Sequence, residues 1–192
     1  MSYTGLDHFI ARKRFRAAYP HIRKGARVCD LGCGLDAAFL DFAAERIAHG
    51  VGVDDQVRDG AAGRWQRVRA DIRAALPLES GQFDNVVMLA VLEHLVEPEP
   101  VLREAYRILA PGGSLILTWP AAMVDPILKV LHGLRLVSDE MKLDQHQKRI
   151  PVGALQQMLY RIGFTDFLHY TFELGLNNLM VAHRQSRDAP DR

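Results

Sequence analysis

The stretch "VCDLGCGLDAAFL", from Val28 to Leu40, decides the fold because its character changes at its two glycines. It begins as an apolar strand, breaks at Gly32 and Gly34, and continues with the composition of a helix. Glycines after a strand form a tight turn and let a ligand approach the backbone closely. The stretch therefore predicts a site for a nucleotide-like ligand, which carries either a pyrophosphate or a positive charge.

Apolar segments alternate with helical patterns along the rest of the chain. The predicted strands cover 27–31, 50–54, 65–70, 83–91, 114–119, 164–172 and 177–184. The predicted helices cover 6–19, 36–47, a stretch within 97–113, 125–136 and 151–162. Between Asp54 and Arg67 the chain is so short that any helix there is short or missing. Strands that alternate with helices favour right-handed crossovers and helices on both faces of a parallel sheet.

This pattern predicts an α/β fold, a three-layer Rossmann-like sandwich around a mainly parallel seven-stranded sheet. The last two predicted strands are joined by a short loop around Gly175. They are therefore expected to pair as a C-terminal antiparallel hairpin.

The 192 residues, 48% of them hydrophobic, are expected to form a single domain over 1–184. Within it we expect an N-terminal helical segment at 1–24 and an insertion at 121–150 outside the sheet core. The basic run at 12–16 is interpreted as a solvated helix face. A disordered tail is expected at 185–192.

The charges of the chain are balanced. Lysine and arginine number 24, aspartate and glutamate 23, and the formal net charge is +1. Since nucleic-acid binding depends on a basic surface, no nucleic-acid partner is expected. No segment approaches the roughly 20 apolar residues that span a bilayer, and the first residues lack a signal-peptide pattern. We therefore expect a cytoplasmic protein without stable membrane insertion.

Cys29 and Cys33 are the only cysteines, and three residues separate them. This spacing is neither a C-x-x-C redox pair nor half of a zinc site. Both are expected to be small packing residues in a reducing compartment, and no metal site is predicted.

A dinucleotide is one candidate for the ligand of the glycine turn. Gly32, Gly34 and Ala37 satisfy the G-x-G-x-x-[GA] pattern. Asp54 lies about twenty residues further on, where that pattern has a ribose-binding acid. An NAD-binding Rossmann protein is therefore one interpretation of the glycines, which by themselves indicate only a tight turn.

Two acidic residues argue against a pyrophosphate. Asp30 lies two residues before the first glycine, and Asp36 stands at the start of the predicted helix, where it also fits the helix N-cap. Two carboxylates around a pyrophosphate would repel it strongly. The arrangement favours a ligand that has an ammonium group and no phosphate. S-adenosylmethionine meets this requirement with its α-amino group and sulfonium, and it adds a ribose diol and an adenine.

Four motifs in register carry a family resemblance. They are "VCDLGCG" (28–34), "GVGVDD" (50–55), "RADIRAALPLESGQFDNVVMLAVLEHL" (69–95) and "REAYRILAPGGSLILTWP" (103–120). In this order they resemble the successive motifs of class I S-adenosylmethionine-dependent methyltransferases, particularly the methyltransferase-11-like group. The resemblance is close over 27–120 and continues loosely to the closing hairpin.

The resemblance implies how the methionine end of S-adenosylmethionine is held. Asp30, with the backbone at Gly32, would bind it, and Cys33 and Gly34 complete the same turn. The residues at the end of the fourth predicted strand would line the methionine channel; they are Leu89 and Ala90.

The resemblance also implies the contacts of the nucleoside. Asp54 would accept both ribose hydroxyls, with Asp55 beside it. Asp71 would accept the adenine amino group, and the amide of Ile72 would donate to the ring. The family often has a third glycine at Asp36 and an apolar residue at Asp55. Because of the missing glycine and the short segment after Asp54, a more open adenine pocket and modest affinity are expected.

Methyl transfer needs a base only for some acceptors. His94, just past the fourth predicted strand, is the first candidate and His146 the second, and for each a hydrogen-bonding or capping role is the alternative. The 1–24 segment and the 121–150 insertion are expected to build the acceptor pocket, either as a lid or through core packing.

Two functional hypotheses remain open at this point. The first is an enzyme that methylates oxygen, nitrogen or carbon of a small molecule, which is apolar or lipid- or glycan-linked if the insertion is a lid. The second is a non-catalytic S-adenosylmethionine-binding module or partner subunit. In the first, S-adenosylhomocysteine is the product, and a monomer or homodimer is expected.

Overall fold

The structure is a computed structural model and describes residues 5–62, 64–121 and 150–186. In these ranges the strands form one sheet in the order β3-β4-β2-β1-β5-β6-β8-β7. The strands are β1 (Ala26–Leu31), β2 (Ile47–Asp54), β3 (Gly60–Ala62), β4 (Trp65–Arg69), β5 (Phe83–Leu89), β6 (Leu109–Pro120), β7 (Phe164–Phe172) and β8 (Asn177–Arg184). Strands β4, β2, β1, β5 and β6 run parallel to one another, whereas β3 pairs antiparallel with β4, β8 with β6, and β7 with β8.

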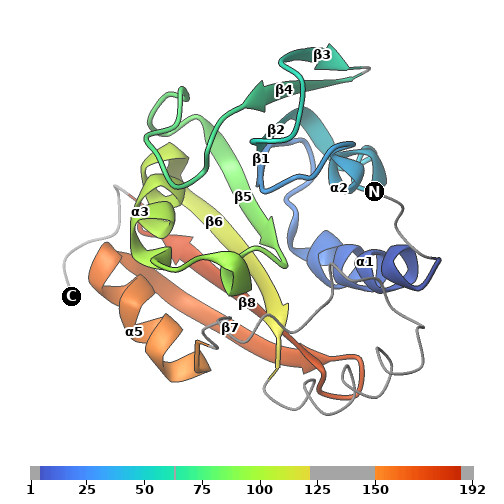
Figure 1. The fold of residues 1–192 in the computed structure, drawn as a ribbon. Coiled ribbons are helices and arrows are strands. Elements are labelled where there is room, and N and C mark those ends of the chain that lie inside the picture. The colour runs from blue at the N-terminus through green and yellow to red at the C-terminus, as the bar shows by residue number, and fades with distance from the viewer. Residues whose placement is uncertain (1–4, 63, 122–149, 187–192) are drawn as a thin grey trace.

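Helices cover both faces of this sheet (Figure 1). The helices are α1 (Gly5–Ala18), α2 (Ala38–Phe42), α3 (Pro98–Ile108) and α5 (Val152–Ile162), with 3₁₀ turns η1 (Tyr19–His21) and η2 (Leu92–His94). Helices α1 and α2 lie on one face of the sheet, and α3 and α5 lie on the other. A cluster of buried apolar side chains fills each of the two interfaces. The predicted three-layer α/β class and the C-terminal antiparallel hairpin are therefore confirmed.

The sheet has one strand more than the seven predicted. Strand β3 follows β2 and pairs antiparallel with β4, with Gly60 opposite Arg67. The segment after Asp54 is too short for a helical crossover, and it instead supplies a short edge strand that covers β4. A covered edge is protected from pairing with another chain.

The helix predicted at 36–47 is much shorter in the structure. Ala37 adopts a left-handed backbone with φ of 50°, so α2 begins only at Ala38. After α2, the guanidinium of Arg46 donates to the carbonyl oxygens of Tyr19 and Pro20 at 2.9 and 3.1 Å. These contacts hold the end of the loop that connects α2 to β2, and β2 begins at the next residue, Ile47.

Two further expectations about element ends are wrong. Asp36 is not the N-cap of α2, because Ala37 holds that position without a side-chain capping hydrogen bond. Strand β6 begins before the predicted start at Ser114, because Leu109 already pairs with Phe83 and the pairing resumes after a register shift.

The basic run at 12–16 is only partly a solvated face. Arg12 and Arg16 are exposed, but Phe15 packs into the cluster beneath α1, with its ring centroid 5.5 Å from that of Phe39. The Nε atom of Arg14 is buried as well. Sequence periodicity alone does not show this, because α1 is held by residues that are distant along the chain.

Several predictions fall outside the described residues. They concern the helix at 125–136, nearly all of the 121–150 insertion, and residues 187–192 of the tail. In the part of the chain that the structure describes, no helix is long and apolar enough to cross a membrane.

Candidate functional site

The glycine turn closes over the carboxyl ends of β1 and β2. Gly32 and Gly34 have φ of 77° and 66°, which side chains rarely tolerate. A Cβ atom on Gly32 would stand 2.5 Å from Cγ2 of Val91, so the turn also packs against the residue that follows β5. The amide of Gly32 donates to the carbonyl of Val53 at 2.8 Å, which ties the turn to β2. Gly32 therefore occupies a position that requires glycine, and Gly34 occupies one that favours it.

Asp54, the last residue of β2, shapes this turn with its carboxylate. Its Oδ2 accepts the amide of Gly34 at 2.9 Å, and its Oδ1 accepts the amide of Gln56 at 3.0 Å. A carboxylate oxygen has two lone pairs, so each oxygen can accept one further hydrogen bond. Asp54 is thus both fixed in orientation and able to accept two hydroxyl groups.

Asp30 lies in the adjacent strand β1 and is only 3% exposed; its register partner in β2 is Gly52, two residues before Asp54. Burial raises the pKa of Asp30 from 3.8 to about 7, and the negative charge of Asp54 adds to the rise. A buried carboxylate with this pKa is stabilised in its charged form by a cation placed beside it. The pair of carboxylates therefore forms an acidic site at the glycine turn.

The two cysteines take structural positions near the turn. Cys29 is fully buried in the core, and the thiol of Cys33 donates to the carbonyl of Gly34 at 3.3 Å. Burial raises the pKa of both thiols well above the usual range. A Cβ atom on Gly52 would stand 2.8 Å from Sγ of Cys33, so the thiol packs tightly against β2. Both cysteines are free, and both pack as the sequence predicts.

The residues predicted to contact adenine lie after β4, and one of them, Asp71, already has a hydrogen-bond partner within the protein. Asp71 accepts hydrogen bonds from Nε and Nη2 of Arg73 at 2.8 and 2.9 Å. These bonds lower the pKa of the Asp71 carboxyl. An adenine amino group would share this carboxylate with Arg73. Ile72 packs against the core, and Asp55 is exposed, with its carbonyl accepting Nε of Arg69 at 3.0 Å.

The end of β5 carries a strained residue. Leu89 is the last residue of the strand, and Ala90 follows with φ of 60°. The amide of Ala90 donates to the carbonyl of Thr118 in β6 at 3.0 Å, which holds the left-handed backbone in place. Strained residues of this kind cluster at ligand sites.

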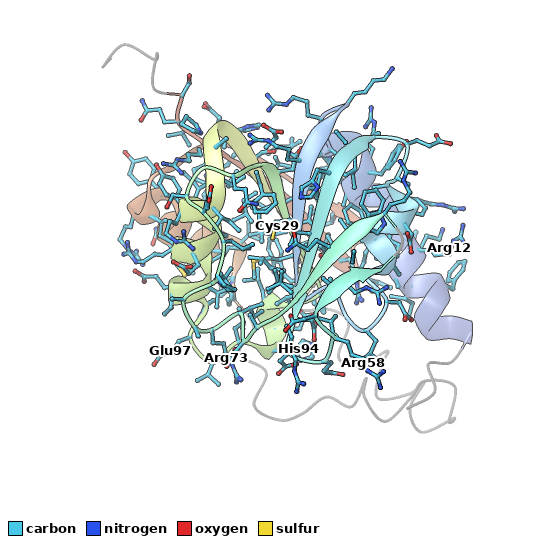
Figure 2. The ribbon with its side chains drawn as sticks, turned by 90° about the horizontal axis from the view of Figure 1, so that it is seen from above. Arg12, Cys29, Arg58, Arg73, His94 and Glu97 are labelled. Atoms are coloured by element: carbon cyan, nitrogen blue, oxygen red, sulfur yellow. The ribbon has the colours of Figure 1, made fainter. Side chains whose placement is uncertain are left out.

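His94 ends the 3₁₀ turn η2, and its amide donates to the carbonyl of Val91 at 3.0 Å. Its side chain is exposed. In Figure 2, His94, Arg73 and Arg58 lie along one side of the molecule, as expected for residues that follow the carboxyl ends of β5, β4 and β2. His146, the second predicted base, lies outside the described residues.

Glu93 and Arg14 are the residues that the sequence analysis misses. The Oε2 atom of Glu93 and the Nε atom of Arg14 are buried. Burial raises the pKa of Glu93, while the charges of Arg14 and His94 oppose the rise. An acid within four residues of the end of a buried strand is a signal for Glu93, but nothing in the local pattern marks Arg14.

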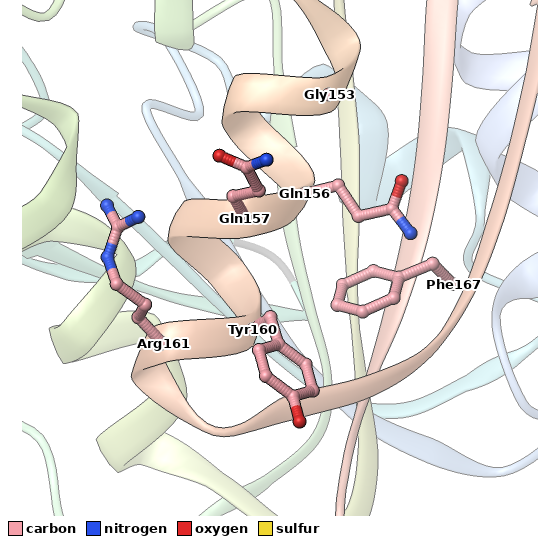
Figure 3. Close-up of a pocket in the computed structure, with 6 residues that line it drawn as sticks. All are labelled: Gly153, Gln156, Gln157, Tyr160, Arg161 and Phe167. Atoms are coloured by element: carbon pink, nitrogen blue, oxygen red, sulfur yellow. The ribbon is translucent and has the colours of Figure 1, made fainter.

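A hollow lies between α5 and β7, away from the glycine turn (Figure 3). Its volume is about 480 Å³, and its lining residues are Gly153, Gln156, Gln157, Tyr160, Arg161 and Phe167. None of the predicted site residues lines it. In the described ranges, no three His, Cys, Asp or Glu side chains lie together as a metal site.

Curated relatives share the central part of the chain. The chain is 32% identical over 106 residues to a ubiquinone biosynthesis O-methyltransferase of Pseudomonas aeruginosa strain UCBPP-PA14. The alignment covers 49% of this chain and 44% of that protein. It is 31% identical over 117 residues to a sterol 24-C-methyltransferase of Neurospora crassa. This alignment covers 55% of this chain and 31% of that protein. The chain thus spans less than half the length of these curated relatives.

Solved structures share the whole fold. An S-adenosylmethionine-dependent methyltransferase of Mesorhizobium loti has a TM-score of 0.67 at 21% identity and covers 94% of this chain and 100% of that chain. An enzyme of the same description from Archaeoglobus fulgidus has a TM-score of 0.68 at 19% identity and covers 92% of this chain and 94% of that chain. At these identities the likeness shows the fold.

The family model described as a methyltransferase domain matches residues 4–169, which is most of the chain. The match covers all four motifs of the sequence analysis. It confirms the resemblance to class I S-adenosylmethionine-dependent methyltransferases, while the methyltransferase-11-like subgroup stays a prediction. This chain therefore belongs to the methyltransferase domain family.

Proposed function

We propose that the protein transfers a methyl group from S-adenosylmethionine to a small-molecule acceptor and releases S-adenosylhomocysteine. The observation that carries this proposal is the buried carboxylate of Asp30 beside Asp54 at the glycine turn. Membership of the methyltransferase domain family and the names of the relatives support the same methyl donor.

The acidic pair fits this ligand better than a dinucleotide. An ammonium group beside Asp30 would stabilise the ionised carboxylate, whose pKa burial raises to about 7. A pyrophosphate at the same place would face two carboxylates in a region of low dielectric constant. Asp54 keeps a lone pair on each oxygen for the two ribose hydroxyls, because each oxygen accepts only one backbone amide.

The remaining predicted contacts complete the proposed cofactor site. Cys33 is held by its bond to Gly34, and Leu89 and Ala90 are held at the end of β5. We assign the methionine channel to these residues and the adenine edge to Asp71, with Asp55 and Ile72 nearby. The bond between Asp71 and Arg73 restricts the adenine contact, which supports a modest affinity.

When bound, S-adenosylmethionine supplies an electrophilic methyl group on a positively charged sulfur. A lone pair of the acceptor forms the new bond to the methyl carbon while the carbon–sulfur bond breaks toward sulfur. The acceptor's proton leaves to a base, for which His94 at the carboxyl end of β5 is the candidate. The protein therefore contributes mainly by positioning the two reactants and by excluding water.

The free cysteines Cys29 and Cys33 support a reducing compartment, and we propose a cytoplasmic enzyme. We propose that it acts as a monomer or homodimer, which size-exclusion chromatography coupled to light scattering tests directly. A larger assembly would contradict this part of the proposal.

The proposal is tested by incubating the purified protein with methyl-labelled S-adenosylmethionine and a protein-free metabolite extract. We expect label in an extractable small molecule, less label with Asp54→Ala, and unchanged label with Glu45→Gln. Glu45 is an exposed acid beyond α2 and serves as the matched control. If calorimetry shows S-adenosylhomocysteine binding but no extract accepts label, the protein is a non-catalytic binding module or partner subunit instead.

A further inference from the structure

Four buried polar atoms at one end of the sheet have no hydrogen-bond partner among the described residues. They are Nε of Arg14, Oε2 of Glu93, Oγ1 of Thr118 and Oδ1 of Asn177; a fifth such atom, Nε of Arg67, belongs to β4. A buried polar atom without a partner costs about 1 to 3 kcal/mol. Natural proteins keep few of them, so a group of four calls for a physical reason.

The sheet register brings these residues to the same edge. Strands β5 and β6 are parallel, so η2, which follows β5, lies near the carboxyl end of β6. In the antiparallel pair of β6 and β8, Pro120 lies opposite Asn177 and Thr118 lies opposite Leu179. Thr118 and Asn177 are therefore diagonal neighbours on one face of the sheet.

That face is the one that α1 covers. Leu179 and Ile116 belong to the cluster beneath α1, and alternation along β6 and β8 places Thr118 and Asn177 on the same side. Thr118 is 0% exposed and Asn177 is 6% exposed. Both side chains are thus buried on the face of the sheet that α1 covers.

Charged groups border this enclosed region. Burial lowers the pKa of Arg14, and the carboxylates of Glu93 and Glu173 oppose the change, so the guanidinium is close to both acids. Glu173 accepts Nδ2 of Asn177 at 2.6 Å. The four residues therefore belong to one continuous polar region, which runs from η2 past α1 to the turn before β8.

We propose that Arg14, Glu93, Thr118 and Asn177 form the wall of the methyl-acceptor site, and that this acceptor wall binds a neutral compound with adjacent hydroxyl groups. The inference rests on the proposed function, since it names the acceptor of the same reaction. Glu93 directly precedes His94, the candidate base, in the 3₁₀ turn η2.

The hydrogen-bonding capacities of the acceptor wall select this chemistry. Oε2 of Glu93 and Oδ1 of Asn177 require donors, Nε of Arg14 requires an acceptor, and Oγ1 of Thr118 takes either role. A hydroxyl group both donates and accepts, so adjacent hydroxyls satisfy all of these needs. A carboxylate or phosphate would meet Arg14 but would be repelled by Glu93 and Glu173, and an ammonium group would meet those acids but would be repelled by Arg14.

Three probes that share two adjacent hydroxyl groups and differ in the charge of their third substituent test the acceptor class. They are 3,4-dihydroxybenzyl alcohol, 3,4-dihydroxybenzoate and 3,4-dihydroxybenzylamine, each titrated into the protein saturated with S-adenosylhomocysteine. We expect the neutral alcohol to bind at least about tenfold more tightly than either charged probe, because each charged probe meets a like charge at the wall. Glu93→Gln should reduce the discrimination against the benzoate.

A substitution that removes an unpaired atom separates binding from folding. Thr118→Val keeps the shape of the side chain and deletes the unpartnered hydroxyl, so the unfolding midpoint should stay the same or rise. Binding of the alcohol should weaken by about fivefold or more, the scale of one lost hydrogen bond, while binding of S-adenosylhomocysteine is unchanged. Thr171→Val, on the exposed side of β7, is the matched control and should change neither binding.

The outcomes distinguish this inference from the proposed function. If wild-type protein does not bind S-adenosylhomocysteine, the proposed function is wrong and the inference falls with it. If S-adenosylhomocysteine binds but the benzoate or the amine binds as well as the alcohol, or no probe binds, only the inference is wrong. A parallel loss of stability and of S-adenosylhomocysteine binding in Thr118→Val would likewise assign the wall a structural role and overturn the inference.

Discussion

Replacement of Asp30 by asparagine should make the protein more stable while it weakens the cofactor site. Asp30 is buried in β1, and burial together with Asp54 raises its pKa to about 7, whereas the unfolded chain ionises near 3.8. Between pH 3.8 and about pH 7, Asp30 stays protonated in the folded protein, whereas in the unfolded chain it has lost its proton. Stability is therefore lost as the pH rises from about 4 to about 7, and the loss is complete above that range.

The size of this effect follows from the difference between the two pKa values. One pKa unit corresponds to 1.36 kcal/mol, so a rise from 3.8 to about 7 corresponds to about 4 kcal/mol of lost stability. Part of the loss is already present at mildly acidic pH. Between about pH 5 and about pH 8 the free energy of unfolding of the wild type should fall by about 2.5 kcal/mol on account of Asp30.

Urea unfolding of the wild type and of Asp30→Asn at these two pH values measures the effect. The advantage of the variant should be about 2.5 kcal/mol larger at the higher pH. The constant cost of packing an amide cancels in this comparison, and Glu45→Gln provides the control at an exposed acid. An advantage that does not change with pH would refute the reasoning, because Asp30 would then have an ionic partner in the folded protein. In the same variant, binding of S-adenosylhomocysteine should weaken because the ammonium group loses its counter-charge.

Three other substitutions test the site. Asp54→Ala should weaken S-adenosylhomocysteine by about 1.5 to 3 kcal/mol, the scale for hydrogen bonds to a charged group, and calorimetry that finds an unchanged dissociation constant in folded protein would show that the ribose lies elsewhere. His94→Gln should lower single-turnover methyl transfer by roughly 10² to 10⁴ at unchanged cofactor affinity, and a rate within about threefold of wild type would remove His94 from the mechanism. Gly32→Ala should destabilise the fold by at least about 1 to 3 kcal/mol in urea, because its left-handed backbone and the nearby Val91 side chain leave no place for a Cβ; equal stability would mean that the turn can relax.

Local patterns predict the features that depend on neighbours in sequence. The glycine turn, Asp30 and Asp54 lie where the motifs place them, because strand ends and tight turns leave direct signals in composition. The short helix α2 was not predictable in this way. The connection after it is held by the contact of Arg46 with Tyr19, which the fold brings close from another element.

The missed site residues depend on packing between elements that are distant in sequence. Arg14 lies within a basic run that is typical of a solvated surface, and its burial follows only from the docking of α1 on the sheet. That Thr118 and Asn177 are diagonal neighbours depends on the register of β6 and β8, which no local pattern states. The bond between Asp71 and Arg73 likewise depends on how the chain turns after β4.

Calorimetric titration of the wild-type protein with S-adenosylhomocysteine and, separately, with NAD tests the central claim most directly. The acidic pair of Asp30 and Asp54 predicts that S-adenosylhomocysteine binds with a dissociation constant in the micromolar range, about −8 kcal/mol, and that NAD gives no measurable heat. Tighter binding of NAD than of S-adenosylhomocysteine would contradict the account, because a pyrophosphate would then occupy the turn where these carboxylates should exclude it.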